Sequence, residues 1–288
     1  MRVAYLLEDT GISATARVVT AQADALIANG YQVRIVSPAA PLTWRSSRAE
    51  WIDVDELRRY VAEPGEIVVD ANSDVVRSNP IVDDEFYRER LPRENQPLRV
   101  LLAGGSQHED KGIGEGYGAV AHARWFHQTL ELIRVSPWAP SRDEPLDSVQ
   151  EFHVALTARE MTRLVHSCDV LVAPNRREDP LSLTTIEALA SGLACVVTST
   201  PEHLALARRI ADRGSQIAEE RLRDPTFAFA PPDNAVELGE KLIEVLSDTA
   251  LRQQLRTQGR EAAEQFRSVN VVKRVEASLA SRLPSPAE

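Results

Sequence analysis

Short apolar runs alternate with amphipathic segments along the chain, and this alternation predicts an α/β fold. The expected elements of the first third are strands at residues 2–7, 33–36 and 67–69, and helices at residues 16–28 and 54–61. Asn29-Gly30 closes the first helix, because glycine tolerates the left-handed conformation at a helix end. A strand–helix–strand opening favours a parallel sheet with helices on both faces.

A more regular pattern follows from residue 98 onward. The expected strands are residues 98–103, 130–135, 151–156, 169–173, 194–198 and 227–230. The expected helices follow Lys111-Gly112, span residues 158–167 and 183–191, begin after Asp233 and Asp248, and cover residues 269–283. Thr157 and Glu160 form a capping box, in which each side chain bonds a backbone amide hydrogen at the helix start.

Two unequal domains are expected, joined by a polar linker. Asn79-Pro80 and the acidic run at residues 83–85 have the composition of such a linker. We therefore expect a reduced, Rossmann-like N-terminal domain at residues 1–96, a larger domain at residues 97–268, and a closing helix and tail at residues 269–288.

Composition and charge narrow the functional classes. Hydrophobic residues make up 43% of the 288 residues and charged residues 26%, which is typical of a globular protein. The net charge of −10 disfavours a nucleic-acid binder. No apolar run reaches the roughly 18 residues that a spanning helix needs. With two cysteines, Cys168 and Cys195, and no signal-peptide pattern at the start, the expected compartment is a reducing cytoplasm.

The most informative segment is residues 173–192, where a buried strand leads through an acidic loop into a helix. Free amides at such a helix start, here at Leu183 and Thr184, together with the helix dipole favour anion binding. Glu178 and Asp179 in the loop and Glu187 in the helix could reach one ligand and suit neutral sugar hydroxyls. The alternative is that all three acids are ordinary charges of a solvated loop and a helix start.

A second constellation lies at residues 104–112. Gly104 and Gly105 form a turn after a strand, and Lys111 precedes the next helix, so exposed amides and a mobile cation could meet a diphosphate. The alternative is an ordinary strand–helix loop. The Walker spacing is absent, no G-x-G-x-x-G follows the first strand, and no G-x-S-x-G is present. The six histidines show no metal-ligand spacing, so no metal is expected.

Taken together, these motifs resemble the retaining GT-B glycosyltransferases of family 4. The similarity rests on Gly104 with Lys111-Gly112, on residues 168–175, and on the acidic loop with the Glu187-Ala188-Leu189-Ala190-Ser191-Gly192 helix. Residues 79–83 resemble the family's linker, and Gly11 with Arg17 resembles the first loop of its acceptor domain. The resemblance implies a GT-B-like fold of two Rossmann-like parallel-sheet domains.

The resemblance also implies a function and roles for residues. A nucleotide diphosphate sugar would be the donor substrate, a small-molecule, glycan or lipid-linked molecule the acceptor, and no cofactor or metal would be needed. Lys111 would neutralise the leaving diphosphate, Glu187 would bind the ribose, and Asp179 would bind sugar hydroxyls. Substrate-binding roles would fall on Gly104, Gly105, Asn175, Glu178, Leu183, Thr184, Gly11 and Arg17.

Several departures from the family pattern keep a second hypothesis open. Asp179 stands where the family has the first glutamate of a pair whose second member corresponds to Glu187. The arginine that usually follows the family's glycine turn is replaced by Gly105-Ser106. The N-terminal domain is short, and no histidine precedes His108. The alternative is a glycosyltransferase-like protein that binds a nucleotide sugar or a partner without transfer, or a chain whose short domain is completed by an oligomer or partner chain.

Overall fold

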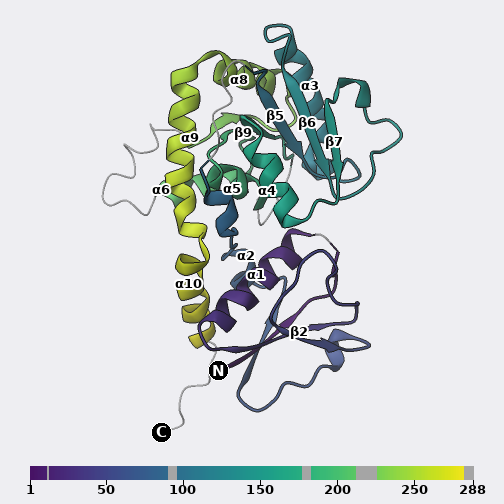
Figure 1. Cartoon of the computed structure of the whole chain (residues 1–288), viewed down its shortest axis with the longest axis vertical. Coiled ribbons are helices and arrows are strands. Elements are labelled where there is room, and N and C mark those ends of the chain that lie inside the picture. The colour runs from purple at the N-terminus through teal and green to yellow at the C-terminus, as the bar shows by residue number, and fades with distance from the viewer. Residues whose placement is uncertain (12, 90–95, 177–182, 212–225, 282–288) are drawn as a thin grey trace. The chain divides into compact units, whose positions relative to one another are not determined.

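The computed structural model describes residues 1–288 apart from residues 12, 90–95, 177–182, 212–225 and 282–288 (Figure 1). The chain forms two compact units. Unit 1 consists of Met1–Asp84 with Gln265–Glu288, and unit 2 of Glu85–Glu264. The fold is α/β, with a parallel sheet in each unit.

Unit 1 is assembled from both ends of the chain. Its final helix, α10 (Ser268–Ala280), packs on α1 (Ala14–Ala28) (Figure 1). The sequence pattern predicts a boundary near residue 96 and a separate closing helix, whereas the compact units divide after Asp84 and again before Gln265. The physical reason is the apolar face of α10, whose residues Val271, Val275 and Leu279 are fully buried.

The sheet of unit 1 has the order β3-β2-β1-β4 among the described residues, with every pairing parallel. Its strands are β1 (Arg2–Leu6), β2 (Gln32–Ser37), β3 (Glu50–Asp53) and β4 (Glu66–Asp70), and the short helical elements are η1 (Leu57–Arg59), α2 (Asp74–Arg77) and η2 (Asp84–Tyr87), the last of which begins at the unit boundary. Ser13 caps α1 by accepting a hydrogen bond from the Ala16 amide at 3.1 Å, and Gly30 follows its end at φ +84°.

In unit 1 one predicted helix was wrong and one strand was missed. The helix expected at residues 54–61 is only the 3-10 turn η1, because this segment has no apolar face to bury: no residue of η1 is buried, and Val61 is 84% exposed. The third strand is β3, which pairs with β2 at the sheet edge, and the predicted strand at residues 67–69 is the fourth strand, β4. The half-buried pattern of β3 carries little hydrophobic signal.

Unit 2 alternates strands and helices in the order expected from the sequence, apart from a helix at Pro201–Ala211 that was not predicted. Its strands are β5 (Arg99–Ala103), β6 (Glu131–Ser136), β7 (Glu151–Val154), β8 (Val170–Ala173), β9 (Ala194–Thr198) and β10 (Ala228–Ala230). Its helical elements are η3 (Glu109–Lys111), α3 (Ile113–Arg124), η4 (Leu146–Ser148), α4 (Ala158–His166), α5 (Leu183–Ala190), α6 (Pro201–Ala211), α8 (Ala235–Ser247) and α9 (Thr249–Ala263), followed by η6 (Glu264–Phe266) at the unit boundary.

The sheet of unit 2 is doubly wound. Its order is β10-β9-β8-β5-β6-β7 with parallel pairing throughout, so the chain starts in the middle and reverses direction between β5 and β8. Every residue of β8 and β9 is buried, as expected for strands covered on both faces. α3 and α8 lie side by side over one face (Figure 1), and α9 packs against β9 and α5.

Helix caps in unit 2 follow the sequence signals with one exception. The Thr157–Glu160 capping box is present, and Asp248 caps α9 by accepting from the Ala250 and Leu251 amides. Asn234, not Asp233, caps α8. Asp233 cannot hold the cap because its backbone is left-handed at φ +59° and its carboxylate bonds Arg176.

Candidate functional site

The candidate site lies at the carboxyl edge of the unit 2 sheet, where β5 and β8 run side by side. The connections that leave these two strands diverge, since the strand order reverses there. In open parallel sheets, this switch point leaves a crevice beyond the strand ends in which ligands bind. β5 leads into Gly104 and β8 into Pro174, so both predicted motifs begin at this edge.

The two loops contact each other directly. The Arg176 amide donates a hydrogen bond to the Asp110 carbonyl at 2.8 Å. Gly112 lies so close to β8 that a Cβ atom built on it would be 1.9 Å from the Pro174 carbonyl oxygen, and its φ of +59° is left-handed. Because Lys111 lies between Asp110 and Gly112, and Asn175 between Pro174 and Arg176, the structure brings these two predicted residues into one neighbourhood.

Gly104 and Gly105 form the turn that was predicted after β5. Gly104 has φ +135°, and a Cβ on it would lie 3.4 Å from Lys111 Cγ, so the lysine stem packs over the turn. A Cβ on Gly105 would lie 2.5 Å from the Trp138 ring. Both glycines therefore serve close approach: one admits Lys111 and the other Trp138.

Three of the remaining predicted residues of unit 2 lie on α5. Leu183 and Thr184 form its first turn, and Glu187 lies one turn further along with only 1% of its surface exposed. Asn175 is also buried, and the Thr198 hydroxyl donates to its carbonyl at 2.5 Å. Glu178 and Asp179 lie outside the described residues, so the predicted pairing of Asp179 with Glu187 stays a prediction.

The two predicted residues of unit 1 lie at the carboxyl edge of its own sheet. The Gly11 amide donates to Asp9 Oδ1 at 2.8 Å, and Arg17 lies in the first turn of α1. Trp44 borders the same loop, since its Nε1 donates to the Thr10 carbonyl at 2.9 Å. Trp44 is thus partly buried within its own unit.

Arg176 is a cation of the site that the sequence did not single out. Its side chain lies against Gly112 and pairs with Glu115 at 3.2 Å and with Asp233. The hydrogen bond to Asp233, aided by the charge of Glu115, raises the pKa of this guanidinium. In the sequence, the only indication that Arg176 belongs to the site was its position shortly after β8, which it shares with Asn175.

A buried ion pair beside the glycine turn was also missed. Arg134 on β6 is fully buried, and its Nε donates to Glu144 Oε1 at 2.8 Å. Burial by itself would raise the pKa of Glu144, but the hydrogen bond from Ser106 and the charge of Arg134 outweigh it and hold this pKa below its ordinary value of 4.5. The Glu144 carboxylate is therefore an anion at neutral pH.

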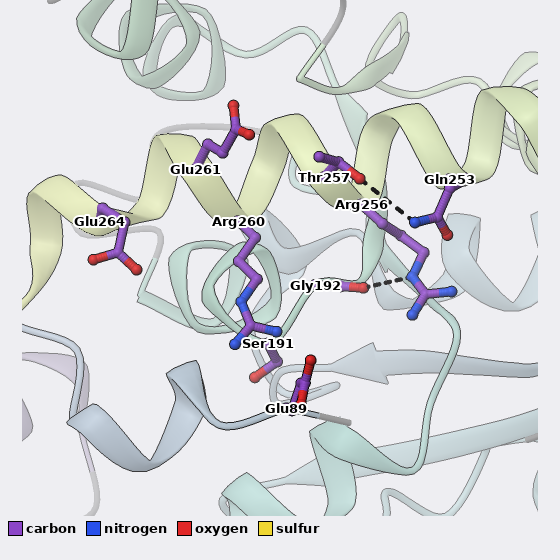
Figure 2. A pocket seen from close by; sticks show the side chains of 9 residues that line it. All are labelled: Glu89, Ser191, Gly192, Gln253, Arg256, Thr257, Arg260, Glu261 and Glu264. Carbon is purple, nitrogen blue, oxygen red and sulfur yellow. Dashed lines mark hydrogen bonds between the residues drawn. The ribbon is translucent and has the colours of Figure 1, made fainter. Parts of the chain in front are cut away.

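Of two cavities in unit 2, one lies at this edge of the sheet and the other lies away from it. One, of about 310 Å³, opens beside the glycine turn and is lined by residues of the turn, the start of α3, the loop after β6, and Arg176. The other, of about 480 Å³, lies along α9, next to the Ser191-Gly192 turn that leads into the opposite end of β9 (Figure 2). The first cavity shows that the turn is not sealed by packed apolar side chains.

The larger cavity is polar and partly closed by its own hydrogen bonds. Arg256 Nε donates to the Gly192 carbonyl at 2.9 Å, and Arg260 donates to the Tyr87 carbonyl. Figure 2 shows both guanidinium groups on the side of α9 that faces Ser191 and Gly192. These arginines cap backbone carbonyls at the edge remote from Lys111, so this cavity is distinct from the candidate site.

Among the residues that the structure describes, no group of three or more His, Cys, Asp and Glu side chains could hold a metal ion. No helix among the described residues combines the length and the apolar character needed to cross a membrane.

Comparison with known proteins gives the family and the fold. Residues 93–248 match the family described as Glycosyl transferases group 1. No curated protein matches the chain in sequence. Among solved structures, a glycosyltransferase from Rickettsia africae superposes with a TM-score of 0.70 at 11% identity, covering 97% of this chain and 98% of that one.

Two more solved structures are similar over nearly the whole chain. WaaG, a glycosyltransferase involved in lipopolysaccharide biosynthesis, has a TM-score of 0.67 at 14% identity and covers 98% of this chain and 100% of its own. Sucrose-phosphate synthase from Thermosynechococcus elongatus has a TM-score of 0.66 at 13% identity, with 97% and 98% covered. At these identities the likeness shows the fold, which is GT-B.

Proposed function

The chain belongs to the group 1 glycosyl transferases, and we propose that it transfers a hexose from a nucleotide diphosphate sugar to an acceptor hydroxyl, with retention and without a metal. The observation that carries the proposal is the meeting of the Lys111 loop with the Asn175 loop at the β5/β8 edge, through the Arg176–Asp110 hydrogen bond and the Gly112–Pro174 contact.

Different residues of this edge bind different parts of the donor. Lys111 neutralises the charge that grows on the diphosphate as the bond from the anomeric carbon to the phosphate oxygen breaks. The amide of Gly105 and the first amides of α5, at Leu183 and Thr184, bind the diphosphate oxygens, whereas the Gly104 amide donates to the Val135 carbonyl at 2.9 Å and Gly104 serves the site by admitting Lys111. Glu187 accepts hydrogen bonds from the ribose hydroxyls, a task for which a buried carboxylate is suited.

The remaining roles follow from the resemblance to the retaining family. Asp179, with Glu178 beside it, binds the hydroxyls of the transferred sugar, and Asn175 lines the donor site. The acceptor hydroxyl oxygen attacks the anomeric carbon from the face that the diphosphate leaves, and its proton passes to the departing phosphate oxygen, so that the configuration is retained. Gly11 and Arg17 at the carboxyl edge of the unit 1 sheet contact the acceptor.

A donor-turnover assay tests this proposal. Purified protein is incubated with UDP- and GDP-sugars and mixed acceptors, and release of UDP or GDP is followed with wild type and the Lys111→Ala variant. Release by wild type that is lost in Lys111→Ala supports transfer. Absence of release from every donor, despite measurable nucleotide binding, contradicts transfer.

Binding without transfer is a second candidate function. The observation that favours it is the small first unit, whose sheet has four strands in its described residues against six in unit 2. The glycine turn also carries Ser106 where a second cation would help to bind a diphosphate. A protein of this kind would bind UDP or GDP yet consume no donor, so the same assay separates the two functions.

A further inference from the structure

The loop between β6 and β7, residues 137–150, folds back on the glycine turn. Its only helical element is the 3-10 turn η4. Trp138 lies against Gly105, and the Gln107 side-chain amide donates to the Ala139 carbonyl at 3.1 Å. The His108 ring meets the Trp138 ring at a centroid distance of 5.1 Å. Residues 105–108 are therefore held along their length by this loop.

Glu144 links this loop to the turn and to its other neighbours by hydrogen bonds. Its Oε2 accepts from the Ser106 hydroxyl at 2.9 Å and from the Ser141 amide at 3.3 Å. Its Oε1 accepts from the Tyr117 hydroxyl at 2.9 Å and from Arg134 Nε at 2.8 Å. One carboxylate thus joins the turn, the loop, α3 and β6.

The burial of this carboxylate makes the junction stiff. The side chain of Glu144 is 1% exposed and that of Arg134 is 0% exposed. A buried charge that loses a partner is strongly destabilised, so the Glu144 oxygens cannot leave their donors at low cost. Ser106 is the one donor of this set that belongs to the glycine turn, and its position follows that of Glu144.

The geometry points to Glu144 as a positioning residue, which through Ser106 fixes the glycine turn so that its amides meet the donor diphosphate. The inference rests on the proposed function. Preorganised amides stabilise an anion without the cost of ordering a loop on binding, and supporting hydrogen bonds are what hold such amides in place. In this chain the support comes from a carboxylate 38 residues further along.

A purely structural role for Glu144 makes a different prediction. In that case the hydrogen bonds of Glu144 contribute only to folding. Removing the Ser106 hydroxyl of the turn should then have the same effect as removing the Tyr117 hydroxyl of α3. Ser106→Ala deletes the bond to the turn, and Tyr117→Phe deletes a bond of equal length to the same carboxylate from the helix. Ser106→Thr keeps the hydroxyl and serves as the rescue variant.

The first experiment measures Kd for UDP and for GDP by calorimetry, at a temperature where thermal unfolding shows every variant folded. We expect Ser106→Ala to weaken binding of the nucleotide that wild type prefers by about three- to tenfold, the value of one hydrogen bond. Ser106→Thr should restore most of the affinity. Tyr117→Phe should lower Tm but leave Kd within about twofold of wild type, because its bond lies outside the turn.

A second measurement needs no ligand. Hydrogen exchange of the amides at residues 105–108 should accelerate in Ser106→Ala and not in Tyr117→Phe, since only the former releases the turn.

The outcomes separate this inference from the proposed function. Equal effects of Ser106→Ala and Tyr117→Phe on Kd and on exchange, or no effect of Ser106→Ala, overturn the positioning role while nucleotide binding stands. If wild type binds neither UDP nor GDP, both the proposed function and the positioning role fail.

Discussion

Gly112 and Pro174 approach each other more closely than any other residue type at position 112 would allow. A Cβ on Gly112 would lie 1.9 Å from the Pro174 carbonyl oxygen, where the backbone of Gly112 is left-handed at φ +59°. This contact joins the loop that carries Lys111 to the loop that carries Asn175. The geometry of the candidate site therefore depends on the absence of one methyl group.

Replacing that glycine should damage both folding and the site. We expect Gly112→Ala to lower the free energy of unfolding by about 1–3 kcal/mol, the usual cost of a strained backbone position, and to abolish nucleotide binding. Gly114→Ala is the matched control, because nothing lies within 4 Å of its Cβ position and it lies in the first turn of α3, the helix that Gly112 precedes. The control should be as stable as wild type or about 0.5–1 kcal/mol more stable. Chemical denaturation with nucleotide titration checks both, and equal behaviour of the two variants would refute the contact.

Removing the charge of Glu144 should be costly and should change the pH dependence of stability. Glu144→Gln leaves Arg134 buried without its anion, and we expect a loss of about 3 kcal/mol in the free energy of unfolding. Glu131→Gln, which affects a more exposed pair with Arg99 at 3.4 Å, should cost less than about 1 kcal/mol.

The sign of the pH effect follows from the lowered pKa of Glu144. The unfolded chain binds this proton more readily than the folded one, so the contribution of Glu144 is present above its ordinary pKa of 4.5 and is lost as the pH falls below it. Denaturation from pH 7 to pH 3 should show a smaller loss of stability in Glu144→Gln than in wild type. Parallel curves would contradict the assignment.

Both cysteines should resist thiol reagents in the folded protein. Cys168 and Cys195 are fully buried, and burial raises the pKa of the Cys195 thiol, which lowers its thiolate fraction. We expect a colorimetric thiol assay to find no rapidly reacting thiol at pH 8 under native conditions and two after denaturation. Rapid native labelling of either cysteine would show that its strand is more open than the structure has it.

The polar cavity along α9 should contribute to stability without affecting the site. Arg256→Ala removes the hydrogen bond to the Gly192 carbonyl, and we expect a loss of about 1 kcal/mol in the free energy of unfolding with unchanged nucleotide affinity. Gln253→Ala, on the same face of α9, should cost less, because the hydrogen bond that the Gln253 side chain donates to the Thr257 hydroxyl is 3.5 Å long. A change in nucleotide affinity in Arg256→Ala would link this cavity to the site.

The sequence predicted the regular part of the fold well because periodicity is a local signal. Residues 194–198 form β9 within the predicted bounds, and the Thr157–Glu160 capping box is present as expected. The strand β3 was missed because an edge strand with half-buried residues has no continuous apolar run. The union of α10 with the N-terminal unit was missed because packing between distant segments leaves no local trace.

The candidate site was predicted in part for the same reason. Gly104 and Lys111 follow a strand within ten residues, so their motif could be recognised from spacing. Glu144 could not, because its partners Ser106, Tyr117 and Arg134 lie 38, 27 and 10 residues away and one acid in a polar loop is unremarkable in a sequence. The place of Arg176 in the site could likewise be recognised only once β8 is placed beside β5.

We propose that the edge formed by β5 and β8 binds a nucleoside diphosphate through Lys111 and Glu187. The most direct measurement is the thermal shift with UDP and GDP for wild type, Lys111→Ala and Glu187→Gln, with Lys241→Ala as the control, because Lys241 pairs with Glu244 on the surface of α8. At about 100 times Kd, one nucleotide should stabilise wild type and Lys241→Ala by about 2.7 kcal/mol. We expect this shift to be lost in Lys111→Ala and Glu187→Gln. A wild type that neither nucleotide stabilises, or a shift that persists in both site variants, would contradict it.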